Sequence, residues 1–409
     1  MSHPVSPLAP AAQPALPALA GVRLATGAAG IRYKDRTDVL LVELAAGTAA
    51  AGVFTRSLTR SAPVDWCRTA LAGGKARALV VNAGNANAFT GKSGEASVER
   101  TVKAAARLLG CADTEVYVAS TGVIGEPMAD DRLTAALPAL KGQLGDDWAA
   151  AARAIMTTDT YPKAVVRTAK IDGVEVRLQG IIKGSGMIQP DMATMLGFIF
   201  TDAAVAQPAL QTLLARYTPR TFNSITVDSD TSTSDTVLLF ATAKAGHAPV
   251  AEAGDKRLAS FRRALEAVMR DLALLVVKDG EGVEKLVTIE VSGAASERSA
   301  RRLGLAVANS PLVKTAIAAG DAKWGRIVMA VGKSGEKADR DRLAISIGGV
   351  AVARAGARVE GYDEAPIARH MAGRDIRVTI DVGIGRGKAT VWTGDLTHRY
   401  IDINGSYRS

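Results

Sequence analysis

The glycine-containing polar segment 183–194 has the residue types in this chain that best suggest chemistry. It ends in Thr194, and an apolar run at 196–200 follows. The Thr194 hydroxyl could attack the carbonyl carbon of Ala193 and break that peptide bond, which would make Thr194 a new N-terminus. A threonine hydroxyl needs a base at neutral pH, and an α-amine with an ordinary pKa of about 7.7–8.0 suits that task. The segment therefore predicts a self-processing threonine nucleophile whose own amine is its general base.

Few other side chains could activate a nucleophile or hold a metal ion. The chain has four histidines, and none has the H-x-x-x-H spacing of a zinc site. The two cysteines, Cys67 and Cys111, form no C-x-x-C pair and do not indicate a disulfide framework. This cysteine usage is typical of a cytoplasmic protein. We expect neither a metal ion nor a bound cofactor.

Thr121 and Gly122 could supply hydrogen-bond donors to such a nucleophile. They follow a predicted strand at 115–119. A threonine hydroxyl and an adjacent glycine N–H can converge on one oxygen, as an oxyanion hole requires. An ordinary Ser-Thr-Gly turn is the alternative. Lys183, on its glycine-containing loop, could pair with a carboxylate or a phosphate, and a solvated lysine is the alternative there.

Three further polar segments have both a structural and a functional interpretation. The acidic turn at 278–282 directly follows a predicted helix, where its carboxylates oppose the helix dipole, so it is either a functional site or a simple turn. The asparagine-rich segment 82–88 is either a set of Asx turns or a rigid polar loop that lines a site. The segment 228–235 is dense in hydroxyls and carboxylates, but it lacks the glycine and terminal glutamate of a calcium loop.

Two glycine-containing segments resemble phosphate-binding loops without completing the pattern. The segment 91–93, Gly-Lys-Ser, would need a glycine at position 86, which is an alanine, so nucleotide binding is not expected. The segment 383–388 lies between two predicted strands. A hairpin turn with positive φ explains its glycines better than a phosphate site does.

The composition argues against a protein that binds nucleic acid or spans a membrane. The 409 residues are 48% hydrophobic but only 4% aromatic, and the net charge of +9 is spread along the chain. The basic cluster 298–302 contains no aromatic side chain on which a base could stack. No run of about 18 apolar residues exists to cross a membrane. A soluble basic surface on a protein of two or three domains is the better expectation.

Hydrophobic periodicity places the polar segments among short strands and amphipathic helices, which indicates a mixed α/β or α+β fold. The Pro/Ala-rich residues 1–20 are expected to form a disordered tail. The change of pattern near residue 285 divides a catalytic domain, 21–285, from a C-terminal domain, 286–409. Strands are predicted at 39–44, 78–81, 115–119, 287–291, 343–347 and 376–382, and helices at 94–110, 208–216 and 255–275.

Taken together, many of these segments resemble the ornithine acetyltransferases (glutamate N-acetyltransferases) of arginine biosynthesis. The resemblance covers nearly the whole chain after the tail, with the segments in the family's order. Ser229, Lys323 and Gly394 depart from the family pattern, and none of them is the nucleophile. The similar segments are 51–55, 82–87, 120–125, 156–160, 183–196, 226–228, 278–282, 324–326, 395–397 and 400–409.

The resemblance implies a layered α/β/β/α catalytic domain with mixed sheets and a smaller C-terminal α+β domain. It implies cleavage between Ala193 and Thr194, with Thr194 as both the cleavage nucleophile and the acyl acceptor. Thr121 and Gly122 match the oxyanion-hole pair. The positions that match substrate-binding residues are Thr157, Lys183, Thr194, Glu281, Asn404 and Ser409.

The implied reaction is a ping-pong transfer of acetyl from N2-acetylornithine to glutamate through an acetyl ester on Thr194. Lys183 would hold the α-carboxylate of each amino acid, and Glu281 would face the δ-ammonium of ornithine. The family suggests a dimer of αβ units, and acetyl-CoA as a second donor would make the enzyme bifunctional. The alternatives are a self-processing aminopeptidase or amidase on the same fold, in which water takes the acyl group, and an unprocessed binding protein.

Overall fold

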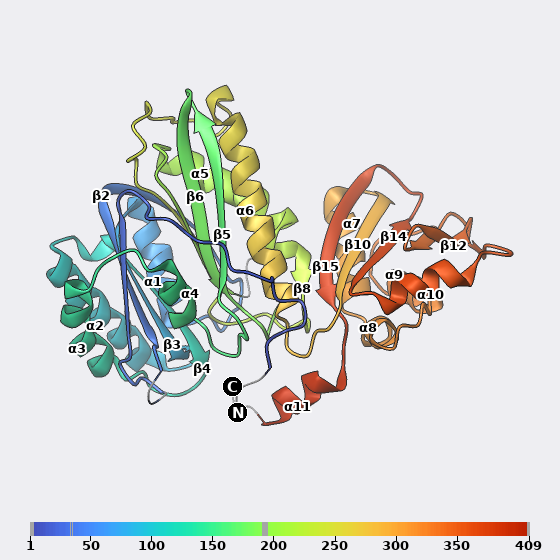
Figure 1. The fold of residues 1–409 in the computed structure, drawn as a ribbon, viewed down its shortest axis with the longest axis horizontal. Helices are drawn as coiled ribbons and strands as arrows, with labels where there is room; N and C mark the ends of the chain where they lie inside the picture. The colour runs from blue at the N-terminus through green and yellow to red at the C-terminus, as the bar shows by residue number, and fades with distance from the viewer. Residues whose placement is uncertain (1–3, 33, 35, 190–194, 407–409) are drawn as a thin grey trace.

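The computed structural model of the chain describes residues 4–32, 34, 36–189 and 195–406. Within these residues the strands form two sheets (Figure 1). The first contains β1 (Val22–Gly27), β2 (Val39–Phe54), β3 (Lys75–Asn85), β4 (Val116–Val123), β5 (Lys163–Ile171), β6 (Val174–Lys183), β7 (Leu196–Thr201) and β9 (Thr236–Ala241). The second contains β8 (Ile225–Thr226), β10 (Leu286–Ala294), β11 (Ala344–Ile347), β12 (Val350–Arg354), β13 (Ala357–Arg358), β14 (Asp375–Asp381) and β15 (Gly387–Gly394).

Strand β2 is long enough to belong to two halves of the first sheet. The strand order is β4-β3-β2-β9-β7-β6-β5, with β1 paired to β2. Residues 39–43 of β2 pair with β3, and its residues 49–54 pair with β9. Tyr117 of β4 and Phe240 of β9 meet edge to face with ring centroids 5.7 Å apart, although β4 and β9 are not neighbours in the sheet. The β1–β4 half therefore packs face to face on the half made of β5, β6, β7 and β9.

Helices cover the outer faces of both halves and complete the expected α/β/β/α layers (Figure 1). Phe198 and Phe200 of β7 share a core cluster with the first half, whereas Ile199 between them packs in the cluster of the helices on the other side. This alternation is what a sheet that is buried on both faces requires. The helices are α1 (Ala62–Ala70), α2 (Gly91–Leu109) and α3 (Asp130–Gly142) outside the first half, α4 (Trp148–Ala154) beside Phe200, and α5 (Gln207–Tyr217) and α6 (Ala259–Lys278) outside the second half.

The predicted helices and strands are confirmed, with boundaries that shift by a few residues, except that β2 continues ten residues beyond its predicted end. Helix α2 ends at Gly110, whose φ of 65° is the left-handed conformation that glycine tolerates. Helix α5 has Pro208 in its first turn, where a missing N–H costs nothing. The predicted start of α6 is instead a 3₁₀ turn at Lys256–Leu258, and Asp255 caps it by accepting a hydrogen bond from the N–H of Arg257.

The second sheet has the order β13-β12-β11-β14-β10-β15-β8 and its own core, covered by helix α7 (Glu297–Ala308) and its neighbours. Strand β8 reaches this sheet from the sequence between α5 and β9 and pairs with β15. The second sheet thus includes a strand from before residue 285 as well as strands after it. The division into a catalytic domain and a C-terminal domain at residue 285 stays a prediction. The remaining helices are α8 (Pro311–Ala318), α9 (Gly325–Gly332), α10 (Glu364–Ala372) and α11 (His398–Ser406).

The predicted hairpin at 383–388 is wrong. Strands β14 and β15 both pair with β10, one parallel and one antiparallel, so the connection between them crosses the end of β10. The backbone N–H groups of Ile384 and Gly385 each donate to the carbonyl oxygen of Gly293 at 2.7 Å. Gly383 does have positive φ, 64°. The glycines therefore allow a close crossover, and local spacing alone could not distinguish this from a hairpin.

Residues 4–20 contain neither helix nor strand, but they contact the rest of the chain, in contrast to the disordered tail that the sequence predicts. The Ser6 hydroxyl donates to the carbonyl oxygen of Lys278 at 2.5 Å, and the Gln179 side chain donates to that of Pro17 at 3.1 Å. Leu19 is buried. In the part of the chain that the structure describes, no helix is long and apolar enough to span a membrane.

Candidate active site

A cavity of about 280 Å³ lies where the ends of β4 and β6 meet the starts of β7 and β9. Six of the predicted site residues line it: Thr121, Gly122, Thr157, Lys183, Glu281 and Asn404. Met195, the residue after Thr194 in the sequence, also lines it. Ala193, Thr194 and Ser409 lie outside the described residues. The structure therefore brings together residues that are nearly 300 positions apart in the chain.

Gly122 is held so close to the neighbouring strand that no side chain fits. Its φ is +132°, and a Cβ atom there would lie 2.2 Å from the carbonyl carbon of Gly84 and 2.5 Å from the nitrogen of Asn85. Because an ordinary residue is strained at this φ and would collide with backbone, only glycine allows this approach of β4 to β3. The pair Thr121-Gly122 is thus a rigid part of the cavity wall and more than a surface turn.

The asparagine-rich segment 82–88 supports that wall, and both interpretations of it hold in part. The Asn85 carboxamide oxygen accepts from the N–H of Asn87 at 2.7 Å, which is an Asx turn. The Asn82 side chain donates to the carbonyl oxygen of Asn85 at 2.8 Å and accepts from the Ser120 hydroxyl at 2.6 Å. Ser120 precedes Thr121, so this hydrogen-bonded segment fixes the strand end, while Ala86 lines the cavity.

Lys183 connects the two sides of the cavity. Its ammonium donates to the Thr121 hydroxyl oxygen at 3.1 Å. An ammonium group can only donate, so the O–H of Thr121 stays available for another acceptor. Burial lowers the pKa of Lys183 below its ordinary value, with the carboxylate of Asp159 acting in the opposite direction. The lysine is therefore a wall residue with a bound partner, and the solvated alternative is wrong.

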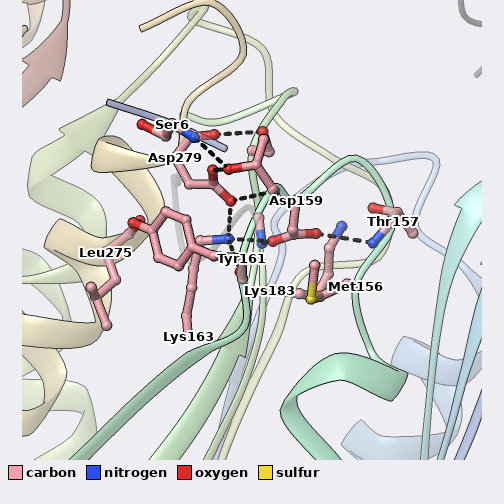
Figure 2. A network of polar contacts seen from close by, with 12 residues as sticks. Ser6, Met156, Thr157, Asp159, Tyr161, Lys163, Lys183, Leu275 and Asp279 are labelled. Carbon is pink, nitrogen blue, oxygen red and sulfur yellow. Dashed lines mark hydrogen bonds and ion pairs between the residues drawn. The ribbon is translucent and has the colours of Figure 1, made fainter. Parts of the chain in front are cut away.

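A buried ion cluster lies behind Lys183 (Figure 2). The Lys163 ammonium lies 2.6 Å from an oxygen of Asp159 and 2.5 Å from an oxygen of Asp279, and all three side chains are fully buried. Burial alone would favour neutral groups, but the two carboxylates raise the pKa of Lys163 above its ordinary value. Likewise Lys163 and Lys183 outweigh burial and hold the pKa of Asp159 below its usual range. Lys163 and Asp159 are therefore charged at neutral pH, whereas burial raises the pKa of Asp279 above its ordinary value, with the Lys163 ammonium acting in the opposite direction.

This cluster positions the backbone of three cavity segments. Asp159 accepts from the N–H of Gly184 at 2.7 Å and from the N–H of Thr157 at 3.0 Å. The carbonyl oxygen of Asp279 accepts from the Ser185 hydroxyl at 2.6 Å. The acidic turn at 278–282 thus binds the glycine-containing loop through its backbone, while the Asp279 carboxylate pairs with Lys163, which compensates for its unfavourable place at the C-terminal end of α6. Sequence analysis missed Lys163, because no local pattern marks a lysine in a strand as buried.

Glu281 faces the cavity with its carboxylate against Gly186. A Cβ atom on Gly186 would lie 2.4 Å from a carboxylate oxygen of Glu281, so a larger residue there would displace the glutamate. The Asn404 side chain of α11 donates to Glu281 at 2.8 Å. Burial raises the pKa of Glu281, with hydrogen bonds acting in the opposite direction. The C-terminal helix therefore reaches back to the cavity and completes this wall.

The segment 228–235 contributes carboxyl groups that were not predicted for the site. Asp228 accepts from the N–H groups of Met187 and Ile188 at 2.6 and 2.8 Å and so fixes the chain at one end of the undescribed stretch. Asp235 is buried and lines the cavity. The density of acidic and hydroxyl side chains in this segment is the sequence signal for its place in the site. No cluster suited to a metal ion occurs in the described residues.

Comparisons with known proteins agree with the sequence motifs. A family model described as the ArgJ family matches residues 23–409. An arginine biosynthesis bifunctional protein ArgJ from Gluconobacter oxydans is 58% identical over 407 residues, which cover 99% of this chain and 96% of that protein. A protein of the same name from Mesorhizobium japonicum is 57% identical over 413 residues and covers all of both chains. A crystal structure of an ArgJ protein from Bacillus halodurans is similar with a TM-score of 0.51 and 36% identity, over 52% of this chain and all of that one.

This chain belongs to the ArgJ family. The resemblance to ornithine acetyltransferases is confirmed, and so is the predicted class, an acyltransferase of arginine biosynthesis.

Proposed function

We propose that this enzyme moves an acetyl group from N2-acetylornithine to glutamate, with Thr194 as the residue that carries the acetyl group between two half-reactions. The observation that supports the proposal most is the convergence of Thr121, Gly122, Lys183 and Glu281 on one cavity. These groups supply hydrogen-bond donors, one cation and one anion, and an N-acetylated diamino acid needs all three. The proposal also places self-cleavage at the bond between Ala193 and Thr194.

In the first half-reaction, the Thr194 oxygen attacks the acetyl carbonyl of the donor. Negative charge then develops on the carbonyl oxygen, and the free O–H of Thr121 and the N–H of Gly122 stabilise it. Because the Lys183 ammonium donates to the Thr121 oxygen, it makes that hydroxyl a stronger donor. Ornithine leaves, and an acetyl ester of Thr194 remains. Glutamate then attacks the ester in the second half-reaction.

Substrate recognition follows from the charges of the wall. Lys183 pairs with the α-carboxylate that both amino acids carry, and Glu281, held by Asn404, faces the δ-ammonium of ornithine. Thr157 and the C-terminal Ser409 complete the predicted set of substrate contacts. Acetyl-CoA as a second donor, a dimer of αβ units and a cytoplasmic location remain part of the proposal by family resemblance.

The test begins with intact masses of the purified protein under denaturing conditions. Two chains of 193 and 216 residues, the second beginning at Thr194, are expected. Thr194→Ala should give one uncut chain without acetyl transfer, and a cut after Ala193 in that variant would contradict the assignment. The processed protein is then supplied with acetylornithine, with and without glutamate. Acetylglutamate as the product supports a transferase, whereas free acetate at equal rates in both samples would show that the enzyme is a hydrolase.

A further inference from the structure

Asp235 is a buried carboxyl group of the cavity wall to which the proposed chemistry gives no task. It immediately precedes β9, and the residue is only 2% exposed. Its backbone is fixed, because its carbonyl oxygen accepts from the N–H of Thr55 at 3.0 Å and the next N–H, that of Thr236, donates to Met195 at 2.9 Å. Among the described residues, one carboxyl oxygen of Asp235 has no hydrogen-bond partner.

The other acidic side chains of the described wall are engaged or open to solvent. Asp228 accepts from two backbone N–H groups at 2.6 and 2.8 Å, and Glu281 accepts from Asn404 at 2.8 Å. Asp230 is exposed. A buried polar oxygen without a partner costs free energy. The unpartnered carboxyl oxygen of Asp235 at the wall of a cavity therefore points to a hydrogen-bond partner that arrives with the substrate.

Acetyl transfer between amines has a proton requirement that supplies such a partner. The amide nitrogen of the donor carries one hydrogen, whereas the α-ammonium of free ornithine carries three. The hydroxyl of Thr194 supplies one of the two missing protons through its own amine, and another group must supply the second. Glutamate poses the reverse problem, since its ammonium must lose two protons to become an amide and only one returns to the Thr194 oxygen.

We propose that Asp235 holds this second proton between the two half-reactions. In the first, protonated Asp235 gives its proton to the departing amine as the C–N bond breaks and the C–O bond to Thr194 forms. In the second, the Asp235 carboxylate takes a proton from the glutamate ammonium. The amine attacks, the C–N bond forms, the C–O bond breaks, and the remaining proton returns to the Thr194 oxygen. Asp235 ends each turnover protonated, so atoms and charges balance.

The surroundings of Asp235 favour its protonated form, which is the form that the first half-reaction requires. Burial raises the pKa of Asp235 well above its ordinary value, while a hydrogen bond from Ser232 and the ammonium of Lys183 act in the opposite direction. General acid–base catalysis is most efficient when the pKa lies near the working pH. The other charged side chains of the described wall are the carboxylates of Asp228, Asp230 and Glu281.

The test uses Asp235→Asn, which keeps the shape of the side chain, in the processed enzyme. Two donors are compared: acetylornithine, whose amine must be protonated, and p-nitrophenyl acetate, whose leaving group departs unprotonated. Two acceptors are compared as well: glutamate, which arrives as an ammonium, and hydroxylamine, which is uncharged at neutral pH. Removing the proton holder should slow the acetylornithine and glutamate steps about 100-fold and change the other two by less than about twofold.

Two outcomes would overturn the role of Asp235. Equal rates in the variant and the wild type for all four compounds would show that it holds no proton, and an equal loss for all four would show that it is structural. Asp146→Asn, at an exposed site, is the control and should change none of them. In Asp235→Ala, added formate should accelerate the glutamate step but not the hydroxylamine step, and acceleration of both or neither would also contradict the proposal.

This inference rests on the proposed function, and the same assays distinguish the two. If wild-type enzyme transfers no acetyl group to glutamate, the proposed function fails. If wild-type enzyme does transfer it and Asp235→Asn behaves identically, only the inference about Asp235 fails. Intact masses give the processed fraction of the variant, and the four rates are compared per processed enzyme, so that a defect in self-cleavage is not counted as a defect in proton transfer.

Discussion

Replacing Lys163 by methionine would leave two carboxylates buried without their shared cation. The Lys163 ammonium lies 2.6 Å from Asp159 and 2.5 Å from Asp279, and none of the three side chains is exposed. Removing one partner of a buried ion pair costs about 3–5 kcal/mol, because uncompensated charge remains. At about 2 °C per kcal/mol for a large chain, the melting temperature should fall by about 6–10 °C.

The size of this loss should depend on pH. In the wild type, although burial acts in the opposite direction, Lys163 and Lys183 hold the pKa of Asp159 below its ordinary value. Asp159 therefore contributes stability above its ordinary pKa, and this contribution is lost as the pH falls through the lowered value. Without Lys163, burial becomes the dominant influence and favours the protonated carboxyl groups. The variant should then gain stability relative to the wild type as the pH falls from neutral toward the ordinary carboxyl pKa.

Thermal melts at several pH values, followed by calorimetry or circular dichroism, measure both effects. Lys103→Met is the matched control, since it removes an exposed lysine that pairs with Glu99 on the surface of α2. It should not change the melting temperature measurably. Acetyl transfer by Lys163→Met should also fall, because Asp159 holds the N–H of Gly184 next to Lys183. If Lys163→Met melts like the wild type at every pH, the cluster does not stabilise the fold.

Three further predictions concern the wall and the second sheet. Gly122→Ala should lower the rate of acetyl transfer about 100- to 1000-fold and should also lower the melting temperature. The reason is that the new Cβ would lie 2.2 Å from the carbonyl carbon of Gly84. A variant with wild-type kinetics would disprove this tight packing. Glu281→Gln should raise KM for acetylornithine about tenfold while intact masses show normal processing, and equal loss of both would make Glu281 structural. Burial lowers the pKa of Lys314 to about 8, so the unfolded chain binds more protons between that pH and the ordinary lysine value, and stability rises with pH there. The melting temperature of Lys314→Met should therefore not rise with pH over this range. If it still rises as in the wild type, the pH dependence belongs to another group.

Much of the fold could be predicted from periodicity, because helices and strands depend on nearby residues. The stripe of α6 and the alternation of β10 and β14 both appear in the structure. Connections between strands were harder to predict. The segment 383–388 has the glycines of a hairpin, yet β10 lies between the two strands that it joins. Only the pairing of strands far apart in the sequence decides such a case.

Cavity residues that belong to recognisable sequence motifs were predicted. Residues whose importance comes only from their burial were missed. Thr121, Gly122, Thr157, Lys183 and Glu281 were all named from the sequence, and all line one cavity. Lys163 was not named and Asp235 was noted only as part of the acidic segment 228–235, because their importance depends on full burial and on partners that lie elsewhere in the sequence. A charged residue has the same local pattern whether it is solvated or enclosed, so only the folded structure distinguishes them.

The strand order has a consequence for how the two processed chains would be held together. Strands β7 and β9 follow the proposed cut, and they lie between β2 and β6, which precede it. Each chain would therefore supply strands to the interior of the same sheet, and neither could leave without breaking hydrogen-bonded ladders on both sides. The peptide bond at the cut is needed to bring these strands together and becomes dispensable once they have paired. Separately produced halves would expose unpaired strand edges, so they should assemble poorly from solution even though the same halves, once folded as one chain, would stay joined.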